Sequence, residues 1–228
     1  MGVKALDVLF EDNHLLVVNK PAGMLVHGDE TGDSTLADLA REYIRVKYNK
    51  PGNVFVGVVH RLDRPVSGVT LLAKTSKALA RLNELFRDKK TKKTYWAVVL
   101  NRPLVEQQTL VHWLIKDSER NVSRAFAKEN AKGARSELSY RIISGNKQFL
   151  LEVNPITGRP HQIRVQLASM RCPIAGDLKY GAAQPLPDKS IALHARQLEF
   201  EHPTLKTTIK VTAPLPTTPV WAPFQHVH

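Results

Sequence analysis

Nine mostly polar residues, 60–68, interrupt two apolar runs, and this interruption constrains the fold more than any other stretch of the chain. The runs at residues 54–59 and 69–73 are rich in valine and leucine, which is typical of buried strands. A packed sheet must therefore turn where the polar residues lie. Such a turn between two buried strands is a common place for a functional site.

Asp63 lies inside this polar stretch, between Arg61 and Arg64. Opposite charges favour the anionic form of a carboxylate, and a positioned, ionised carboxylate can act as a nucleophile. The alternative is a surface ion-pair cluster on a tight turn that Pro65 and Gly68 shape. For a loop considered alone, the ion-pair cluster is the simpler interpretation.

Helix and strand patterns follow one another irregularly, which predicts an α+β fold with a largely antiparallel sheet. Ser34 is expected to cap a helix that runs to residue 47, and Ser76 a second helix that runs to residue 86. A third helix is expected over residues 161–170. Strands are predicted near residues 8–10, 15–18, 94–100, 109–115, 137–143, 148–153, 190–201 and 206–213.

Two segments lack periodicity. Residues 116–133 are polar and charged, and we expect a long, mobile connection that can contact RNA through its lysines and arginines. Residues 214–228 contain four prolines and are expected to form a proline-rich C-terminal tail or a strap over the surface. The predicted folded domain therefore covers residues 1–213.

The charge balance indicates a polyanionic partner. Lys and Arg number 33 against 21 Asp and Glu, which gives a formal charge of +12 and favours nucleic acid as the partner. A single cysteine, Cys172, excludes an internal disulfide and fits a reducing compartment. No signal peptide or membrane-spanning run is apparent, so we expect a cytoplasmic protein with no membrane partner.

Several kinds of chemistry are disfavoured by spacing. The chain has nine histidines but no His-x-x-x-His or His-Glu-x-x-His pair, so no metal site is predicted. It also lacks a Gly-x-Ser-x-Gly nucleophile elbow and a phosphate-binding glycine loop. A hydrolase of the glycosidase type would need a second carboxylate near Asp63, and none is apparent.

Arg164 is a second candidate for the site. On the helix expected at residues 161–170, Ile163 and Leu167 face the core, which places Arg164 at the margin of the buried face. A charge there needs a partner, and Asp63 is a carboxylate expected to bind a cation. Alternatively, the Arg164 side chain extends to water.

The polar stretch resembles the catalytic signature of the RluA-type pseudouridine synthases, namely His60-Arg61-Leu62-Asp63 followed by Ser67-Gly68. The resemblance covers residues 7–213. Further matching segments follow in the family's order at residues 18–27, 93–99, 157–164, 176–181, 194–195 and 200–203. The sequence departs from the usual family pattern at Pro65-Val66, Pro160 and Gln166. These departures affect loop conformation and target choice rather than the reaction.

This resemblance implies isomerisation of uridine to pseudouridine in structured ribosomal or transfer RNA, by a monomer without cofactor or metal. The implied fold is a mixed, mostly antiparallel sheet, split by a central catalytic cleft and flanked by helices. Many relatives carry an additional N-terminal RNA-binding domain that is not expected here, so RNA affinity must come from the basic surface. The alternative is a catalytically silent RNA-binding or ribosome-assembly factor with the same fold.

The resemblance also assigns roles to residues. Asp63 would be the nucleophile, attacking either the ribose or the uracil ring, and Arg164 would pair with it. Tyr95 would stack on the uracil and help remove a proton, and Arg61 would fill the gap left by the flipped nucleotide. Ile163 would form an apolar wall of the pocket. The remaining expected RNA contacts are His60, Arg64, Arg159 and His161.

Overall fold

The structure is a computed structural model, and it describes residues 6–28 and 32–227. The chain divides into two compact units. Unit 1 consists of the described residues up to Lys92 together with Ala195–Pro214. Unit 2 consists of Lys93–His194 together with the described residues from Leu215 onwards.

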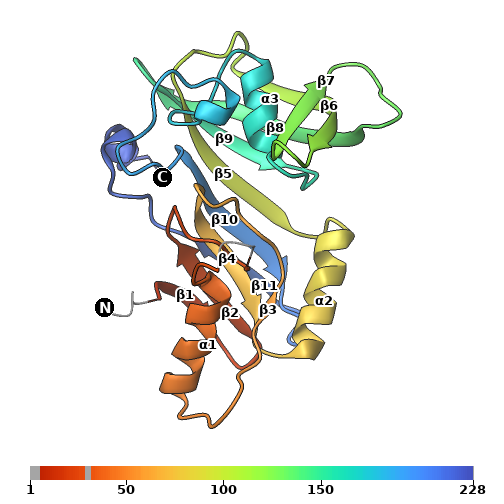
Figure 1. The fold of residues 1–228 in the computed structure, drawn as a ribbon, viewed down its shortest axis with the longest axis vertical. Coiled ribbons are helices and arrows are strands. Elements are labelled where there is room, and N and C mark those ends of the chain that lie inside the picture. Colours follow the sequence, from red (N-terminus) through yellow and green to blue (C-terminus); the bar gives the residue numbers. More distant parts are fainter. Residues whose placement is uncertain (1–5, 29–31, 228) are drawn as a thin grey trace. The chain divides into compact units, whose positions relative to one another are not determined.

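Unit 1 is built on a sheet in the order β1-β2-β4-β10, and β11 pairs with β10 while β3 pairs with β4 (Figure 1). The β1–β2, β2–β4, β3–β4 and β10–β11 pairs are antiparallel. These strands are β1 (Val8–Glu11), β2 (Leu15–Lys20), β3 (Gly57–Val58), β4 (Ser67–Ala73), β10 (Leu193–Glu201) and β11 (Thr208–Thr212). Two helices accompany them, α1 (Leu36–Lys47) and α2 (Ser76–Arg87).

One face of β2 and β4 forms the core of unit 1 with α2. Leu15, Leu71 and Leu82 are fully buried in this cluster, which β10 completes with Phe200. All seven residues of β4 are buried, as expected for a central strand. Burying a side chain of this size stabilises the fold by about 1.5–3 kcal/mol. The core therefore fixes β4, whose first residue follows the polar stretch around Asp63.

In both helices of unit 1, the capping residue lies one position away from the cap predicted from the sequence. Thr35 caps α1, because its hydroxyl accepts from the backbone N–H of Asp38 while the Asp38 carboxylate accepts from the N–H of Thr35. Thr75 caps α2, and Ser76 is its first helical residue. In each case the capping residue is the one with extended backbone angles. Where serine and threonine are neighbours, the sequence does not show which of the two adopts these angles.

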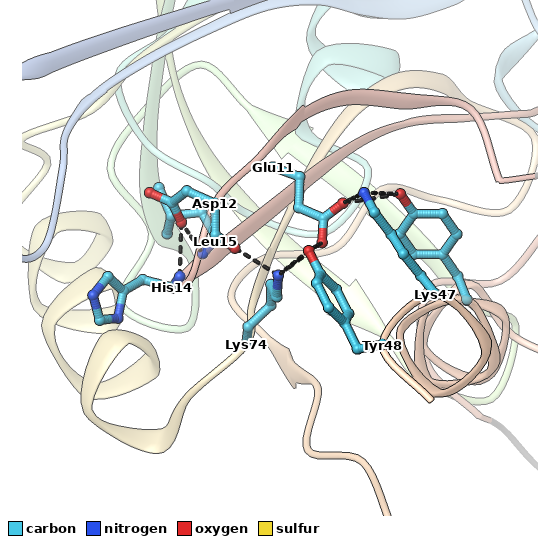
Figure 2. A network of polar contacts seen from close by, with 8 residues as sticks. Glu11, Asp12, His14, Leu15, Lys47, Tyr48 and Lys74 are labelled. Carbon is cyan, nitrogen blue, oxygen red and sulfur yellow. Dashed lines mark hydrogen bonds and ion pairs between the residues drawn. The ribbon is translucent and has the colours of Figure 1, made fainter. Parts of the chain in front are cut away.

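A network of polar contacts holds α1 against β1 (Figure 2). One oxygen of the Glu11 carboxylate accepts from Tyr43 and Lys47, and the other accepts from Tyr48 and Lys74, at 2.7–2.9 Å. Burial raises the pKa of Glu11, but these four hydrogen bonds outweigh it and lower the pKa to about 2. Glu11 is therefore ionised at neutral pH and orients α1.

Unit 2 contains an antiparallel sheet in the order β5-β9-β8-β6-β7. Its strands are β5 (Lys92–Val99), β6 (Gln107–Asp117), β7 (Val122–Phe126), β8 (Ala134–Gly145) and β9 (Phe149–Pro155). The helix α3 (Gln162–Ser169) lies across β6 and β7 (Figure 1). In the C-terminal segment, a 3-10 helix at Pro219–Phe224 buries Val220, Trp221 and Phe224.

The expectation of an unstructured connection at 116–133 is wrong. β6 continues to Asp117, and β7 returns along it, so that Trp113 lies opposite Phe126 and Asp117 opposite Val122. The apolar strand expected at 54–59 is also wrong in extent, because only Gly57–Val58 pairs with β4. The edges of β4 are occupied by β2 and β10, which leaves little room for another strand.

The prediction of an α+β fold with a largely antiparallel sheet and flanking helices is confirmed. Within residues 6–28 and 32–227, every helix falls short of the length and apolar character that crossing a bilayer requires. The division into a domain over residues 1–213 and a tail over 214–228 stays a prediction.

Candidate active site

In unit 1, the turn that precedes β4 presents its residues to different environments. Leu62 and Val66 are buried and anchor the turn, while Arg61 is exposed and Asp63 is half-buried. The carbonyl of Asp63 accepts from the N–H of Val66 at 3.0 Å, which closes the turn. The turn therefore holds the Asp63 backbone in place next to a buried strand.

Lys20 lies at the end of β2, opposite Gly68 in the register, and its side chain is fully buried. Its ammonium group donates to the carbonyls of Pro21, Met24 and Arg64, at 2.9, 2.8 and 3.4 Å. Burial lowers the pKa of Lys20 from 10.5 to about 7, and attraction to the negative charge of Asp63 opposes this shift. A buried cation therefore lies close enough to Asp63 for their charges to interact.

Lys20 is a site residue to which sequence reasoning assigned no role. Its signal was present in the sequence, since the apolar run of β2 ends directly in Asn19-Lys20-Pro21. A lysine at the end of a mostly buried strand has little access to water unless the chain turns away, and here the three carbonyls take the place of water.

The two arginines that flank Asp63 differ in their contacts. Arg64 pairs with Asp33 at 2.8 Å and also donates to the carbonyl of Gly23 at 3.1 Å. The N–H of Gly23 returns a hydrogen bond to the Arg64 carbonyl at 2.7 Å. Arg61 makes no hydrogen bond or ion pair with any described residue. Arg64 thus joins two loops, while Arg61 extends from the turn at an exposed position.

His60 is tied into unit 1 by its ring. Its Nε2 accepts from the backbone N–H of Leu71 at 3.0 Å, and the ring stacks on Phe86 with centroids 5.0 Å apart. Because Nε2 is an acceptor here, the neutral ring carries its proton on Nδ1. These contacts attach the beginning of the polar stretch to β4 and α2.

Gly68 cannot be replaced without moving β10. Its φ is +114°, in the region that favours glycine, and a Cβ there would lie 2.3 Å from the carbonyl oxygen of Ala195. The close approach of these two backbones explains the Ser67-Gly68 pair at the start of β4.

In unit 2, Arg164 forms a buried ion pair with Asp177. Its Nε and Nη2 donate to the two carboxylate oxygens at 2.7 and 2.8 Å, in the bidentate geometry that arginine favours. The exposed fractions of the two side chains are 6% and 1%. Arg164 was expected at the margin of the buried face but is buried, and Asp177 had no predicted role.

Tyr180 connects three segments of unit 2. Its ring lies 5.0 Å from the guanidinium of Arg164, and its hydroxyl accepts from the N–H of Ser123 at 2.8 Å. The hydroxyl also lies 2.7 Å from Nδ1 of His161. Burial raises the pKa of Tyr180, which keeps the hydroxyl protonated. The hairpin at β7 is therefore part of the support of α3, through Ser123.

The loop that precedes α3 is closed by Gln162. Its side-chain oxygen accepts from the hydroxyl of Thr157 and from the N–H of Arg159, at 2.8 and 3.0 Å. His161 follows with φ of 54°, a left-handed backbone that is uncommon outside glycine and asparagine. Arg159 is left exposed at the tip of this loop.

The other expected site residues of unit 2 have defined places. Tyr95 is half-buried on β5, opposite Val153 of β9. Ile163 is 7% exposed on the first turn of α3, and its role as an apolar wall of the pocket stays a prediction. Asp63 belongs to unit 1, whereas Tyr95 and Arg164 belong to unit 2. The expected ion pair of Asp63 with Arg164 and the expected cleft therefore stay predictions.

A metal centre finds no support in the described part of the chain, where no three His, Cys, Asp or Glu side chains gather in a possible binding group. Cys172 is buried, and burial raises the pKa of its thiol, which disfavours the reactive thiolate.

Comparison with known proteins identifies the family. Residues 14–169 match the family described as RNA pseudouridylate synthase. The chain is 35% identical to ribosomal large subunit pseudouridine synthase C of Buchnera aphidicola, over 91% of this chain and 66% of the relative. It is also 35% identical to the uncharacterized RNA pseudouridine synthase YhcT of Bacillus subtilis, over 92% of this chain and 69% of the relative.

A solved structure shows the same fold. Human RNA pseudouridylate synthase domain containing 4 superposes with a TM-score of 0.78 at 26% identity, covering 92% of this chain and 89% of that chain. The chain spans just under two thirds of the length of several curated relatives, such as the synthase C of Vibrio cholerae at 65%. The family match over residues 14–169 includes the turn that carries Asp63. The chain therefore belongs to the RNA pseudouridylate synthase family.

Proposed function

We propose that the chain isomerises uridine to pseudouridine in structured RNA, with Asp63 as the nucleophile. The observation that carries this proposal is the held turn of Asp63 beside the buried Lys20, in a chain of this family. The RNA is ribosomal or transfer RNA. Ribosomal RNA is favoured because relatives in Buchnera and Yersinia are named for the ribosomal large subunit.

The reaction needs no net change in atoms or electrons. The Asp63 carboxylate attacks either the ribose at C1′ or the uracil ring, and the bond from C1′ to N1 of uracil breaks. The base rotates and a bond forms from C1′ to C5, and the bond between the Asp63 carboxylate and the substrate breaks, which returns the free carboxylate. The proton on C5 is then lost and N1 gains one. Because the steps are redox-neutral, side chains of the protein suffice.

The charges around Asp63 favour its ionised form. The positive charge of Lys20 acts on Asp63 within unit 1. In the proposed site Arg164 supplies a second cation, Tyr95 stacks on the uracil and helps remove the proton from C5, and Ile163 forms an apolar wall. Flipping the nucleotide costs a few kcal/mol, which an aromatic face and a space-filling Arg61 offset.

RNA affinity comes from the basic surface of the chain, whose formal charge is +12. His60, Arg64, Arg159 and His161 are proposed to contact the RNA near the target. We further propose that the protein acts as a monomer in the cytoplasm, without a cofactor and away from membranes.

Replacing the nucleophile gives the decisive test. Asp63→Asn is expected to abolish pseudouridine formation while RNA affinity stays within about twofold, because the amide keeps the shape but cannot form the covalent bond. Tritium release from total RNA labelled at C5 of uridine measures turnover, and filter binding measures affinity. Asp88→Asn, at the exposed C-cap of α2, is the matched control and should leave both unchanged.

Unchanged tritium release by Asp63→Asn would refute the assignment of the nucleophile. If the parent chain releases no tritium from any RNA yet binds it, the chain is a silent RNA-binding factor. Comparing pseudouridines in total RNA from a deletion strain and its parent then identifies the target, because a lost modification names the uridine directly.

A further inference from the structure

A pocket of about 420 Å³ lies in unit 1, beside the turn that carries Asp63. Asp63 itself does not line the pocket. Its apolar surface comes from β3 and the residues on either side of it, and its polar surface comes from basic side chains. The apolar residues are Val56, Val58 and Val59, and the basic ones include His27, Arg41 and Arg61.

The charge of this pocket is uniformly basic, since its described lining residues include no carboxylate. Arg41 binds Asp38 through Nη1 at 2.7 Å on the exposed surface of α1, so one of its donors is occupied. Neither Arg61 nor His27 makes a hydrogen bond or ion pair with another described residue. These donors are available to an anion.

An apolar surface bordered by cations matches the chemistry of a nucleotide. A nucleobase offers an apolar face that stacks on or packs against side chains, and its phosphate accepts charge-assisted hydrogen bonds from arginine. A neutral or cationic metabolite would leave the basic side chains without a partner. A polyanionic occupant also agrees with the excess of 33 basic over 21 acidic residues in the chain.

The position of the pocket determines which nucleotide can reach it. Arg61 is two residues from Asp63, so their Cα atoms lie within about 7.6 Å of one another. A nucleotide bound at Arg61 is therefore close in the RNA to the uridine that Asp63 is proposed to attack. Enzymes that flip a base often select their substrate through such flanking nucleotides.

We propose that this pocket binds an unpaired nucleotide that flanks the target uridine, and thereby determines the sequence context in which the enzyme acts. The base lies against Val56, Val58 and Val59, and its phosphate lies at His27 and Arg41, which leaves Arg61 to fill the gap of the flipped nucleotide. This inference rests on the proposed function, and it adds a specificity site to it. The experiments below separate the two.

Cross-linking tests whether RNA occupies the pocket. The probe is a pool of RNA hairpins with a randomised seven-nucleotide loop that contains 4-thiouridine, irradiated with the Asp63→Asn chain and mapped by mass spectrometry. We expect cross-linked nucleotides on His27 or on residues 56–59. Val58→Glu adds a carboxylate to the pocket and should reduce these adducts about tenfold, the effect of losing one stacked base. Val46→Glu, at an exposed position of α1, is the matched control.

Context profiling tests whether the pocket selects the substrate. The same pool without 4-thiouridine is treated with the parent chain, and pseudouridines are located by sequencing. A preference of about tenfold is expected at one or two positions next to the modified uridine. His27→Ala, which changes only an exposed side chain, and Val58→Glu should flatten this preference to less than twofold. His226→Ala and Val46→Glu should retain it.

The outcomes distinguish the two proposals. Pseudouridine formation with an unchanged context profile in His27→Ala and Val58→Glu overturns the pocket but leaves the reaction standing. Absence of pseudouridine, together with adducts on residues 56–59, overturns the reaction and supports the pocket. Adducts confined to other parts of the chain overturn the pocket, and a change of oligomeric state in Val58→Glu would then assign it to a protein contact.

Discussion

Each unit buries a cation beside the residues of the candidate site, but the two cations are held differently. Lys20 in unit 1 is fully buried and donates to three backbone carbonyls. Arg164 in unit 2 is 5% exposed and donates twice to the carboxylate of Asp177. One charge is thus surrounded by dipoles, and the other is paired with a full opposite charge.

The difference determines how each charge responds to pH. The pKa of Lys20 falls to about 7 because burial disfavours its charged form, so its charge varies around neutral pH. An arginine stays protonated in proteins, and a bidentate carboxylate holds it in one orientation. Unit 1 therefore holds an adjustable cation near Asp63, whereas unit 2 holds a fixed cation paired with Asp177.

Breaking the fixed pair should have the largest effect on stability. Asp177→Ala leaves the Arg164 charge buried without its carboxylate, and we expect the free energy of unfolding to fall by about 3–5 kcal/mol. Urea denaturation followed by circular dichroism measures this loss. A loss below about 1 kcal/mol would mean that the pair contributes little to the fold.

A double variant separates the charge from the packing. Arg164→Met combined with Asp177→Leu removes both charges and keeps similar volume, so it should be more stable than Asp177→Ala alone. It should nevertheless lose pseudouridine formation, because the proposed cation next to Asp63 is gone. A double variant that is fully active would remove Arg164 from the proposed mechanism.

The adjustable cation should reveal itself through pH. The folded-state pKa of Lys20, about 7, lies below its usual 10.5, so the unfolded chain binds more protons between these values and stability rises with pH. The difference in free energy of unfolding between the parent chain and Lys20→Met should shift in favour of the parent as the pH rises. The expected shift is about 3 kcal/mol between about pH 7 and about pH 9.5. Urea titrations of both proteins at each pH give this difference.

A parallel pH dependence of the two proteins would show that Lys20 keeps an ordinary pKa. Lys20→Met also tests the electrostatic support of Asp63, because the methionine fills the same space without a charge. Any loss of turnover in this variant should then be greatest below about pH 7, where the parent lysine is mostly charged.

The smallest effect is expected at the hydroxyl of Tyr180, which supports Arg164 only indirectly. Tyr180→Phe leaves the N–H of Ser123 without its acceptor and should cost about 1–3 kcal/mol of stability. Thermal unfolding measures the change. Ser118→Ala, which removes an exposed hydroxyl, is the control and should cost less. Equal losses in the two variants would contradict the buried network.

Local patterns predicted much of the fold correctly. The hairpin of β1 and β2, the helices α1 and α2 and the α+β class follow from apolar periodicity, which neighbouring residues determine. The hairpin at β7 escaped prediction because the hydroxyl of Ser123 points into the protein and donates to the carbonyl of Pro160. A polar inward residue breaks the apolar alternation that marks a strand.

The sequence predicted the candidate-site residues that belong to a motif. It did not predict the contacts that residues from distant segments make with them. His60 to Gly68 identified the turn with Asp63, and the family resemblance added Tyr95 and Arg164. The partner of Arg164 was not predictable, because Asp177 is 13 residues away on another loop. Likewise, only the packed sheet shows that Lys20 is cut off from water.

The sequence alone therefore determined the family, the fold class and the residues that carry the proposed chemistry, since motifs and periodicity are properties of neighbouring residues. The tertiary structure decided which side chains are buried, which charges are paired and where a basic pocket opens beside the turn. Burial and pairing depend on contacts between segments far apart in the chain, and these contacts control the pKa of Lys20 and the orientation of Arg164.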